Sequence, residues 1–103
     1  MQVFFTSQAA QSDEFRDPVV QRVNFVMRRM AWLVPTATVE LSDVVAPSGG
    51  VDKRCLVELK TVRCGRVVVT SIARDWSSAL DNALTSAMGA LRASGQERPQ
   101  AGR

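Results

Sequence analysis

Basic side chains are the residues of this sequence whose type and spacing could do chemistry. The apolar-periodic segment 15–32 carries arginines on the face opposite its apolar side chains, and a loop that leads into a later strand adds two basic residues. Guanidinium groups on a rigid helix can contact several phosphates at once, with an affinity that falls steeply with salt. The candidate phosphate-binding residues are Arg16, Arg22, Arg28, Arg29, Lys53 and Arg54.

The same pattern also has an ordinary structural explanation. An exposed helix face carries charge by default, and Asp13, Glu14 and Asp17 offset part of the positive charge. No exposed aromatic rows are set out for base stacking. The pattern alone therefore favours a solvated surface, and phosphate binding stays open.

Catalytic machinery is almost absent from the sequence. There is no histidine, so neither a Ser-His-Asp nor a Cys-His arrangement can form. Ser48, Gly49 and Gly50 lack the following lysine and helix of a phosphate loop, which favours an ordinary loop. The acidic residues are scattered, with no pair spaced for general acid and base work. We expect no enzyme, no catalytic residue, no cofactor and no small-molecule substrate.

The two cysteines do not suggest a functional site. Cys64 falls in an expected turn and Cys55 near the far end of the preceding strand, too far apart for a disulfide. Unpaired thiols fit a reducing compartment. A metal site would want four ligands, and no histidine is available to help. We expect Cys55 to be a small core residue and no metal to be bound.

Length and composition indicate one globular domain. The chain has 103 residues, of which 46% are hydrophobic and 22% charged, an ordinary balance for a folded protein with a modest core. A net charge of +3 permits an acidic partner without demanding nucleic acid. The first residues have neither a basic region nor a long apolar run, so we expect no secretory or membrane-spanning segment and a cytoplasmic location.

The elements that must position these residues begin with a helix at residues 74–93. Asp75 is its expected N-cap, and Ser94 with Gly95 its expected stop. Alternating large and small side chains should let this helix approach a flat partner closely. The apolar stripe, at i, i+3, i+4 and i+7 spacing, consists of Trp76, Ala79, Leu80, Ala83, Leu84, Ala87, Met88 and Leu91.

The remaining patterns predict one more helix and four strands. A helix is expected over residues 15–32, before Pro35. Period-2 or apolar β-prone runs predict strands at residues 2–7, 36–45, 51–62 and 66–73. The fold class is therefore a two-layer α+β domain in the order β-α-β-β-β-α, with a four-stranded, mostly antiparallel sheet and two helices on one face. We expect the domain to span residues 1–95 and a flexible tail to span 96–103.

A family resemblance rests on this order and on the block VVVTSIARDWSSALDNAL. This order and this block, with the opening MQV and the loop GGVDKRC, resemble the short ribosome hibernation-promoting factors and ribosome-associated inhibitor A proteins over residues 1–93. The signature of that family reads here as Ala73, Asp75, Trp76, Ala79, Leu80 and Asp81. The resemblance implies a cytoplasmic protein that binds small-subunit rRNA in the groove used by mRNA and tRNA. It would inhibit translation under stress, without catalysis.

The resemblance also implies which residues contact rRNA phosphates. Basic residues on both helices do so in that family, which adds Arg92 to the candidates on the first helix and on the loop. The second helix departs from the pattern at Ser86, Gly89 and Ala93, where the family usually carries a basic residue, and Phe25 replaces another. The alternative is a diverged, non-ribosomal module of the same fold for protein interaction or homodimerisation. Its apolar contacts would come from Phe25, Trp32 and the uncovered sheet face.

Overall fold

The structure is a computed structural model that describes residues 1–8 and 12–101, and the side chains of residues 1–8 and 14–93. The predicted order β-α-β-β-β-α is confirmed. Short 3-10 helices occupy Ser12–Phe15 and Arg28–Met30. The main elements are β1 (Gln2–Ser7), α1 (Arg16–Met27), β2 (Thr36–Val45), β3 (Val51–Lys60), β4 (Arg66–Ala73) and α2 (Trp76–Ala101).

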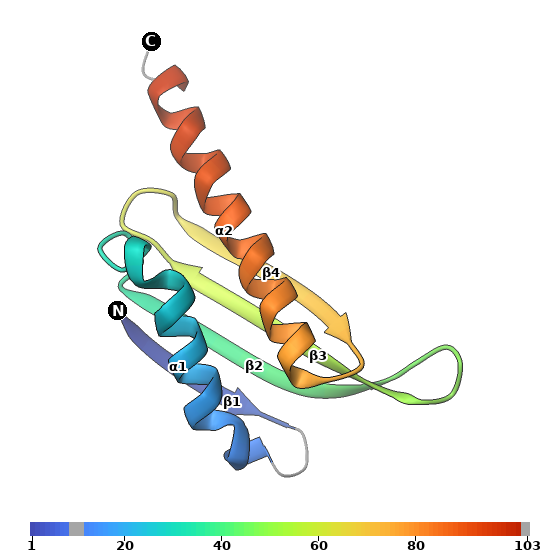
Figure 1. The fold of residues 1–103 in the computed structure, drawn as a ribbon. Helices are drawn as coiled ribbons and strands as arrows, with labels where there is room; N and C mark the ends of the chain where they lie inside the picture. Colours follow the sequence, from blue (N-terminus) through green and yellow to red (C-terminus); the bar gives the residue numbers. More distant parts are fainter. Residues whose placement is uncertain (9–11, 102–103) are drawn as a thin grey trace.

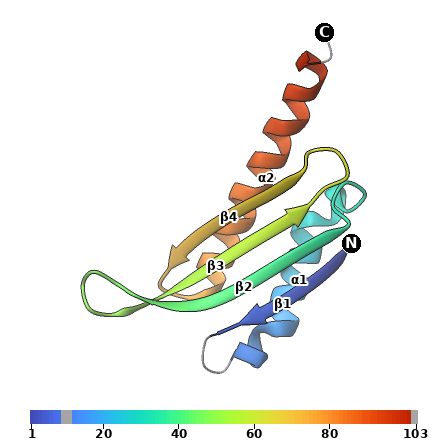
Figure 2. The ribbon, with the colours of Figure 1, turned by 180° about the vertical axis from the view of Figure 1, so that it is seen from behind.

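The four strands form one mixed sheet in the spatial order β1-β2-β3-β4. β1 pairs in parallel with β2, from Gln2 opposite Thr36 to Ser7 opposite Leu41. The other two pairings, β2 with β3 and β3 with β4, are antiparallel. Figure 1 shows both helices on one face of the sheet, and Figure 2 shows the opposite face uncovered. The two-layer α+β class is thereby confirmed.

The core lies between this sheet and the two helices. Successive strand side chains alternate between faces, and the apolar set of each strand faces the helices. α1 contributes Val19, Val23 and Met27, all buried, to the same cluster. The buried strand residues are Phe5, Ala37, Val39, Leu41, Cys55, Val57, Leu59 and Val67. No helix in the described part of the chain is long and apolar enough to cross a membrane.

The N-terminus of α2 confirms the predicted cap. The backbone N–H of Ser78 donates to Oδ1 of Asp75 at 2.7 Å, and the Ser78 hydroxyl donates to Oδ2 at 3.1 Å. Farther along, Ala79, Ala83 and Ala87 are fully buried. These small side chains let the α2 axis approach the sheet closely.

Three predicted boundaries differ from the structure. The predicted stop of α2 at Ser94 and Gly95 is wrong, because the helix continues to Ala101. A glycine inside a helix costs only about 1 kcal/mol relative to alanine, which weakens a helix without ending it. The domain boundary at residue 95 and the flexibility of residues 96–103 stay predictions, and residues 102–103 lie outside the described ones. α1 ends at Met27 and continues as the 3-10 turn Arg28–Met30.

The third boundary is the end of β3 at Lys60, two residues before the predicted one. The chain turns at once because the Thr61 N–H donates to the Gly65 carbonyl at 3.0 Å and the Cys64 N–H donates to the Thr61 hydroxyl at 2.7 Å. Gly65 has a φ of 74°, which favours glycine. The predicted turn at Cys64 and Gly65 is confirmed, with Thr61 closing it.

Candidate nucleic-acid interface

The arginines of α1 and of the 3-10 turn that follows it are positioned by the buried side of the helix. Val19, Val23 and Met27 fix its rotation against the sheet, so that the arginines are left exposed. Two of them gather around one aromatic ring. The guanidinium of Arg28 lies 4.4 Å from the centroid of Phe25, and that of Arg22 lies 5.9 Å from it.

Hydrogen bonding holds this cluster in place. Nη1 of Arg28 donates to the Phe25 carbonyl at 2.8 Å, and Arg29 is exposed next to it in the 3-10 turn. We call Arg22, Phe25, Arg28 and Arg29 the arginine cluster. By the family pattern Phe25 replaces a basic residue, whereas in the structure its ring lies under two guanidinium groups.

The other candidates are not brought into the arginine cluster. Arg16 lies over the ring of Phe5 in β1, 5.5 Å from its centroid. Arg92 is exposed near the far end of the described α2 side chains. Ser86 and Gly89 are also exposed on α2, and a Cβ added at Gly89 would meet no atom within 4 Å.

Lys53 and Arg54 lie inside β3, as the predicted strand at residues 51–62 requires, and their expected place in a loop before that strand is wrong. Because strand side chains alternate, the two residues face opposite sides of the sheet. Lys53 is on the helix side, where its Nζ lies 2.9 Å from Oδ1 of Asp43 and 5.1 Å from the ring centroid of Trp76. Arg54 is on the uncovered side, with Ile72 as its partner on β4. A single binding surface therefore cannot include both Lys53 and Arg54.

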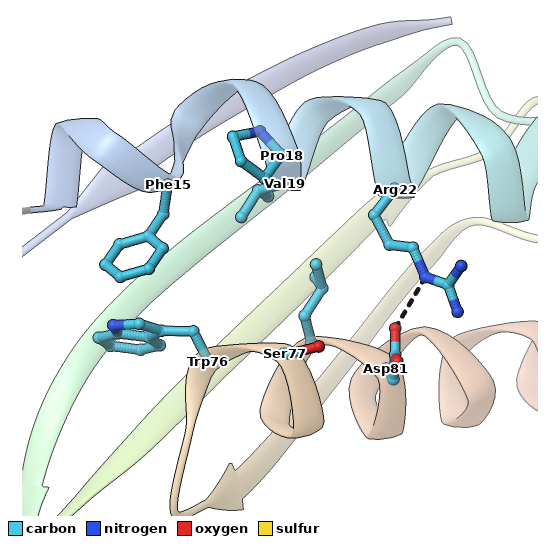
Figure 3. Close-up of a pocket in the computed structure, with 8 residues that line it drawn as sticks. Phe15, Pro18, Val19, Arg22, Trp76, Ser77 and Asp81 are labelled. Atoms are coloured by element: carbon cyan, nitrogen blue, oxygen red, sulfur yellow. Dashed lines mark hydrogen bonds and ion pairs between the residues drawn. The ribbon is translucent and has the colours of Figure 1, made fainter.

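A groove separates α1 from the first turns of α2. Its cavity volume is about 490 Å³, and Figure 3 shows side chains from both helices pointing into it. The rings of Phe15 and Trp76 meet at one end, with centroids 5.9 Å apart and planes inclined at 58°. The lining residues are Phe15, Pro18, Val19, Arg22, Trp76, Ser77, Leu80 and Asp81.

An ion pair crosses this groove. Nε of Arg22 donates to Oδ1 of Asp81 at 2.9 Å (Figure 3), and the side chains of the pair are 47% and 44% exposed. Exposed pairs of this kind contribute about 0–1 kcal/mol. An incoming phosphate could therefore replace the Asp81 carboxylate on Arg22 at low cost.

Sequence reasoning missed Asp81 and Trp76 as neighbours of the basic residues. Asp81 is 59 positions from Arg22, and no local spacing indicates such a pair. The sequence places Trp76 in the apolar stripe and in the family signature, and neither pattern indicates a basic neighbour. The contact of Trp76 with Lys53 follows only from the sheet register, which puts Lys53 opposite Ala73, three residues before Trp76.

The thiols and the acidic residues show no arrangement for chemistry. Burial raises the pKa of the Cys55 thiol to about 12, so this side chain stays protonated and behaves as a core residue. Both cysteines are free. Within the described residues, no three of the usual ligand side chains come together to hold a metal ion.

Comparison with known proteins establishes the fold. No family model and no curated protein matches the chain. The N-terminal domain of Protein Y from Thermus thermophilus matches with a TM-score of 0.65 and 20% identity, over 89% of this chain and 98% of that one. A ribosomal subunit interface protein from Coxiella burnetii matches with a TM-score of 0.65 and 10% identity, over 100% of both chains. The resemblance stated from the sequence is thus confirmed at the level of the fold.

Proposed function

We propose that this protein associates with the ribosome in the cytoplasm and inhibits translation, without catalysis, by binding small-subunit rRNA. The observation that carries the proposal is the match of the whole chain to a ribosomal subunit interface protein. The arginine cluster supports it with a cationic surface on a rigid helix. Ribosome hibernation under stress is the physiological role that the family resemblance suggests.

The mechanism needs position and shape only. Burial of Val19, Val23 and Met27 holds α1 firmly on the sheet, so the backbone positions that carry the guanidinium groups keep a fixed spacing. Guanidinium groups form paired hydrogen bonds with phosphate oxygens, stronger than those of neutral donors. A compact domain bound in the mRNA and tRNA groove would then exclude both ligands by its volume.

Co-sedimentation with purified ribosomal subunits tests this proposal. The double variant Arg22→Glu/Arg28→Glu should lose association with the small subunit at moderate salt. The matched control is Lys60→Glu/Arg66→Glu, which changes the net charge equally on the uncovered sheet face, where these two residues pair across β3 and β4. Absence of the parent protein from ribosomal fractions at both low and moderate salt would refute ribosome binding. Equal losses in the two variants would refute the role of α1.

A gain of affinity should follow when α2 receives the cations it lacks. The double variant Ser86→Lys/Gly89→Lys adds two charges at exposed positions, and the open space around Gly89 accommodates a side chain. Each new phosphate contact should steepen the salt dependence of binding by about one unit in the log-log slope. Competition binding to small subunits at several salt concentrations measures this. An unchanged affinity would place α2 outside the contact surface.

One observation favours the alternative of a homodimer or protein-interaction module. The uncovered sheet face exposes Phe4, Val68 and Ile72. Phe25 and Trp32 support it less, because arginines lie over both rings. Size-exclusion chromatography with light scattering distinguishes the cases: a dimer that Val68→Lys/Ile72→Lys returns to monomer would support this module, and a monomer at high concentration would count against homodimerisation.

A further inference from the structure

The groove between α1 and α2 has the character of a binding site for a flat apolar group. Its apolar lining includes Pro18, Val19 and Leu80, and the half-buried rings of Phe15 and Trp76 lie at one end. The volume of about 490 Å³ is in the range of small-ligand pockets, roughly 300–1,000 Å³. The planes of the two rings are inclined at 58°, so a flat group that stacks on one ring meets the other with its edge.

Positive charge borders this apolar groove on two sides. Arg22 lines it from α1, and Lys53 reaches the ring of Trp76 from β3, with Nζ 5.1 Å from the centroid. Each cation is now paired with an exposed or half-exposed carboxylate, Asp81 and Asp43 respectively. A ligand that fits this arrangement is aromatic in the middle and anionic at its ends.

We propose that this groove takes one unstacked base of a single-stranded RNA, stacked on Trp76 with an edge toward Phe15, and with the flanking phosphates on Arg22 and Lys53. The inference rests on the proposed function, of which it specifies the recognition chemistry. A base inside a duplex is stacked on both faces and cannot enter, whereas loops, bulges and ends present bases that can. The groove therefore makes the protein a reader of unpaired RNA, and not merely of phosphate charge.

A phosphate can enter this groove by replacing Asp81 as the partner of Arg22. The Arg22–Asp81 pair is exposed, so little free energy is lost when a phosphate takes the guanidinium. The Asp81 carboxylate is then left at the side of the groove, where it can accept a hydrogen bond from an N–H on the edge of the base. At the other end a phosphate would replace Asp43 on Lys53, whose side chain is 27% exposed.

Tryptophan fluorescence gives a direct measurement of base insertion. The parent for this experiment is Trp32→Phe, which removes the exposed second tryptophan and leaves Trp76 as the single reporter. Short single-stranded RNA should quench and shift the Trp76 emission. An oligonucleotide of the same length with abasic sites, and a duplex with the same number of phosphates, should bind without this change. Equal quenching by all three would overturn base insertion.

Affinity measurements on groove variants provide the second test. Ser77→Leu fills the mouth of the groove from an exposed position, and its matched control is Thr85→Leu, also exposed on α2 but outside the lining. Loss of one stacked base should weaken single-strand binding by about 5-fold to 150-fold. Trp76→Leu should do the same, provided that its unfolding curve confirms a folded protein.

The results separate this inference from the function it rests on. If Ser77→Leu and Trp76→Leu bind RNA like their parent while Arg22→Glu/Arg28→Glu binds poorly, the groove inference is overturned and the proposed rRNA binding stands. If the parent binds no RNA, both are overturned. Selective weakening by the groove variants, with Thr85→Leu unaffected, supports the groove.

Discussion

Asp75 determines where α2 begins, and its chemistry differs from that of a free carboxylate. The backbone N–H of Ser78 donates to this carboxylate and lowers its pKa, and the Ser78 hydroxyl adds to the effect. A carboxyl whose pKa is lower in the folded state stabilises the fold above its unfolded pKa, and this stabilisation is lost as the pH falls through the folded pKa. Arg22 has a different role, because its partner Asp81 is an exposed carboxylate that another anion can replace.

Replacement of the cap should therefore have a pH-dependent effect. Asp75→Ala should lower the Tm at neutral pH because the first turn of α2 loses its acceptor. The difference from the parent should shrink under acidic conditions, where the parent carboxyl becomes protonated as well. Asp75→Asn is the matched control, since it keeps an acceptor but cannot titrate. Thermal unfolding followed by circular dichroism between acidic and neutral pH measures these differences, and a constant Tm gap for Asp75→Ala would contradict the ionised cap.

At the scale of elements, α2 depends on small side chains for its approach to the sheet. Ala79, Ala83 and Ala87 are fully buried under the helix, while Leu84 and Leu91 fill the space beside them. Large residues at the alanine positions would force the helix away from β3 and β4 or distort the side chains of those strands.

Ala83→Leu should consequently destabilise the protein. Overpacking of a filled core costs about 1–3 kcal/mol, whereas Thr85→Leu on the exposed side of the same helix should change stability by less than about 0.5 kcal/mol. Urea unfolding measured for both variants gives the comparison. A stability of Ala83→Leu equal to that of the parent would mean that the helix has room to move outward.

The elements themselves were largely predictable from the sequence, because their signals are local. The alternation in residues 36–45 correctly predicted β2, the turn at Gly65 correctly predicted that β3 and β4 form a hairpin, and the stripe beginning at Trp76 predicted the buried face of α2. The site was less predictable. The contact of Arg22 with Asp81 and that of Lys53 with Trp76 depend on how distant segments pack. The spacing of residues within one segment therefore cannot predict these contacts.

At the scale of the whole molecule, the sheet divides the predicted basic residues between two surfaces. Arg22, Arg28 and Arg29 belong to the helix layer, and Arg54 belongs to the uncovered face beside Ile72. Electrostatic contacts to RNA should therefore come from one side of the molecule, although positive charge is present on both.

The salt dependence of binding should distinguish these two faces. Arg28→Ala removes one phosphate contact and should reduce the slope of log affinity against log salt by about 0.7 on single-stranded RNA. Arg54→Ala removes the same charge from the other face and should leave the slope unchanged. Titrations with labelled RNA at several salt concentrations provide both values, and a change for Arg54→Ala equal to that for Arg28→Ala would contradict one-sided binding.

The parallel pairing of β1 with β2 has a consequence for the kinetics of folding. β2, β3 and β4 are joined by short turns and can pair as soon as they meet, whereas Gln2 reaches Thr36 only after the intervening chain has closed into a long loop. We therefore expect the transition state to contain the three-stranded meander and to lack β1 with α1. Val57→Ala should then slow refolding, and Val23→Ala should mainly accelerate unfolding. Stopped-flow chevron plots measure both rates. β1, which precedes the other strands in the chain, would then be the last strand to join the sheet.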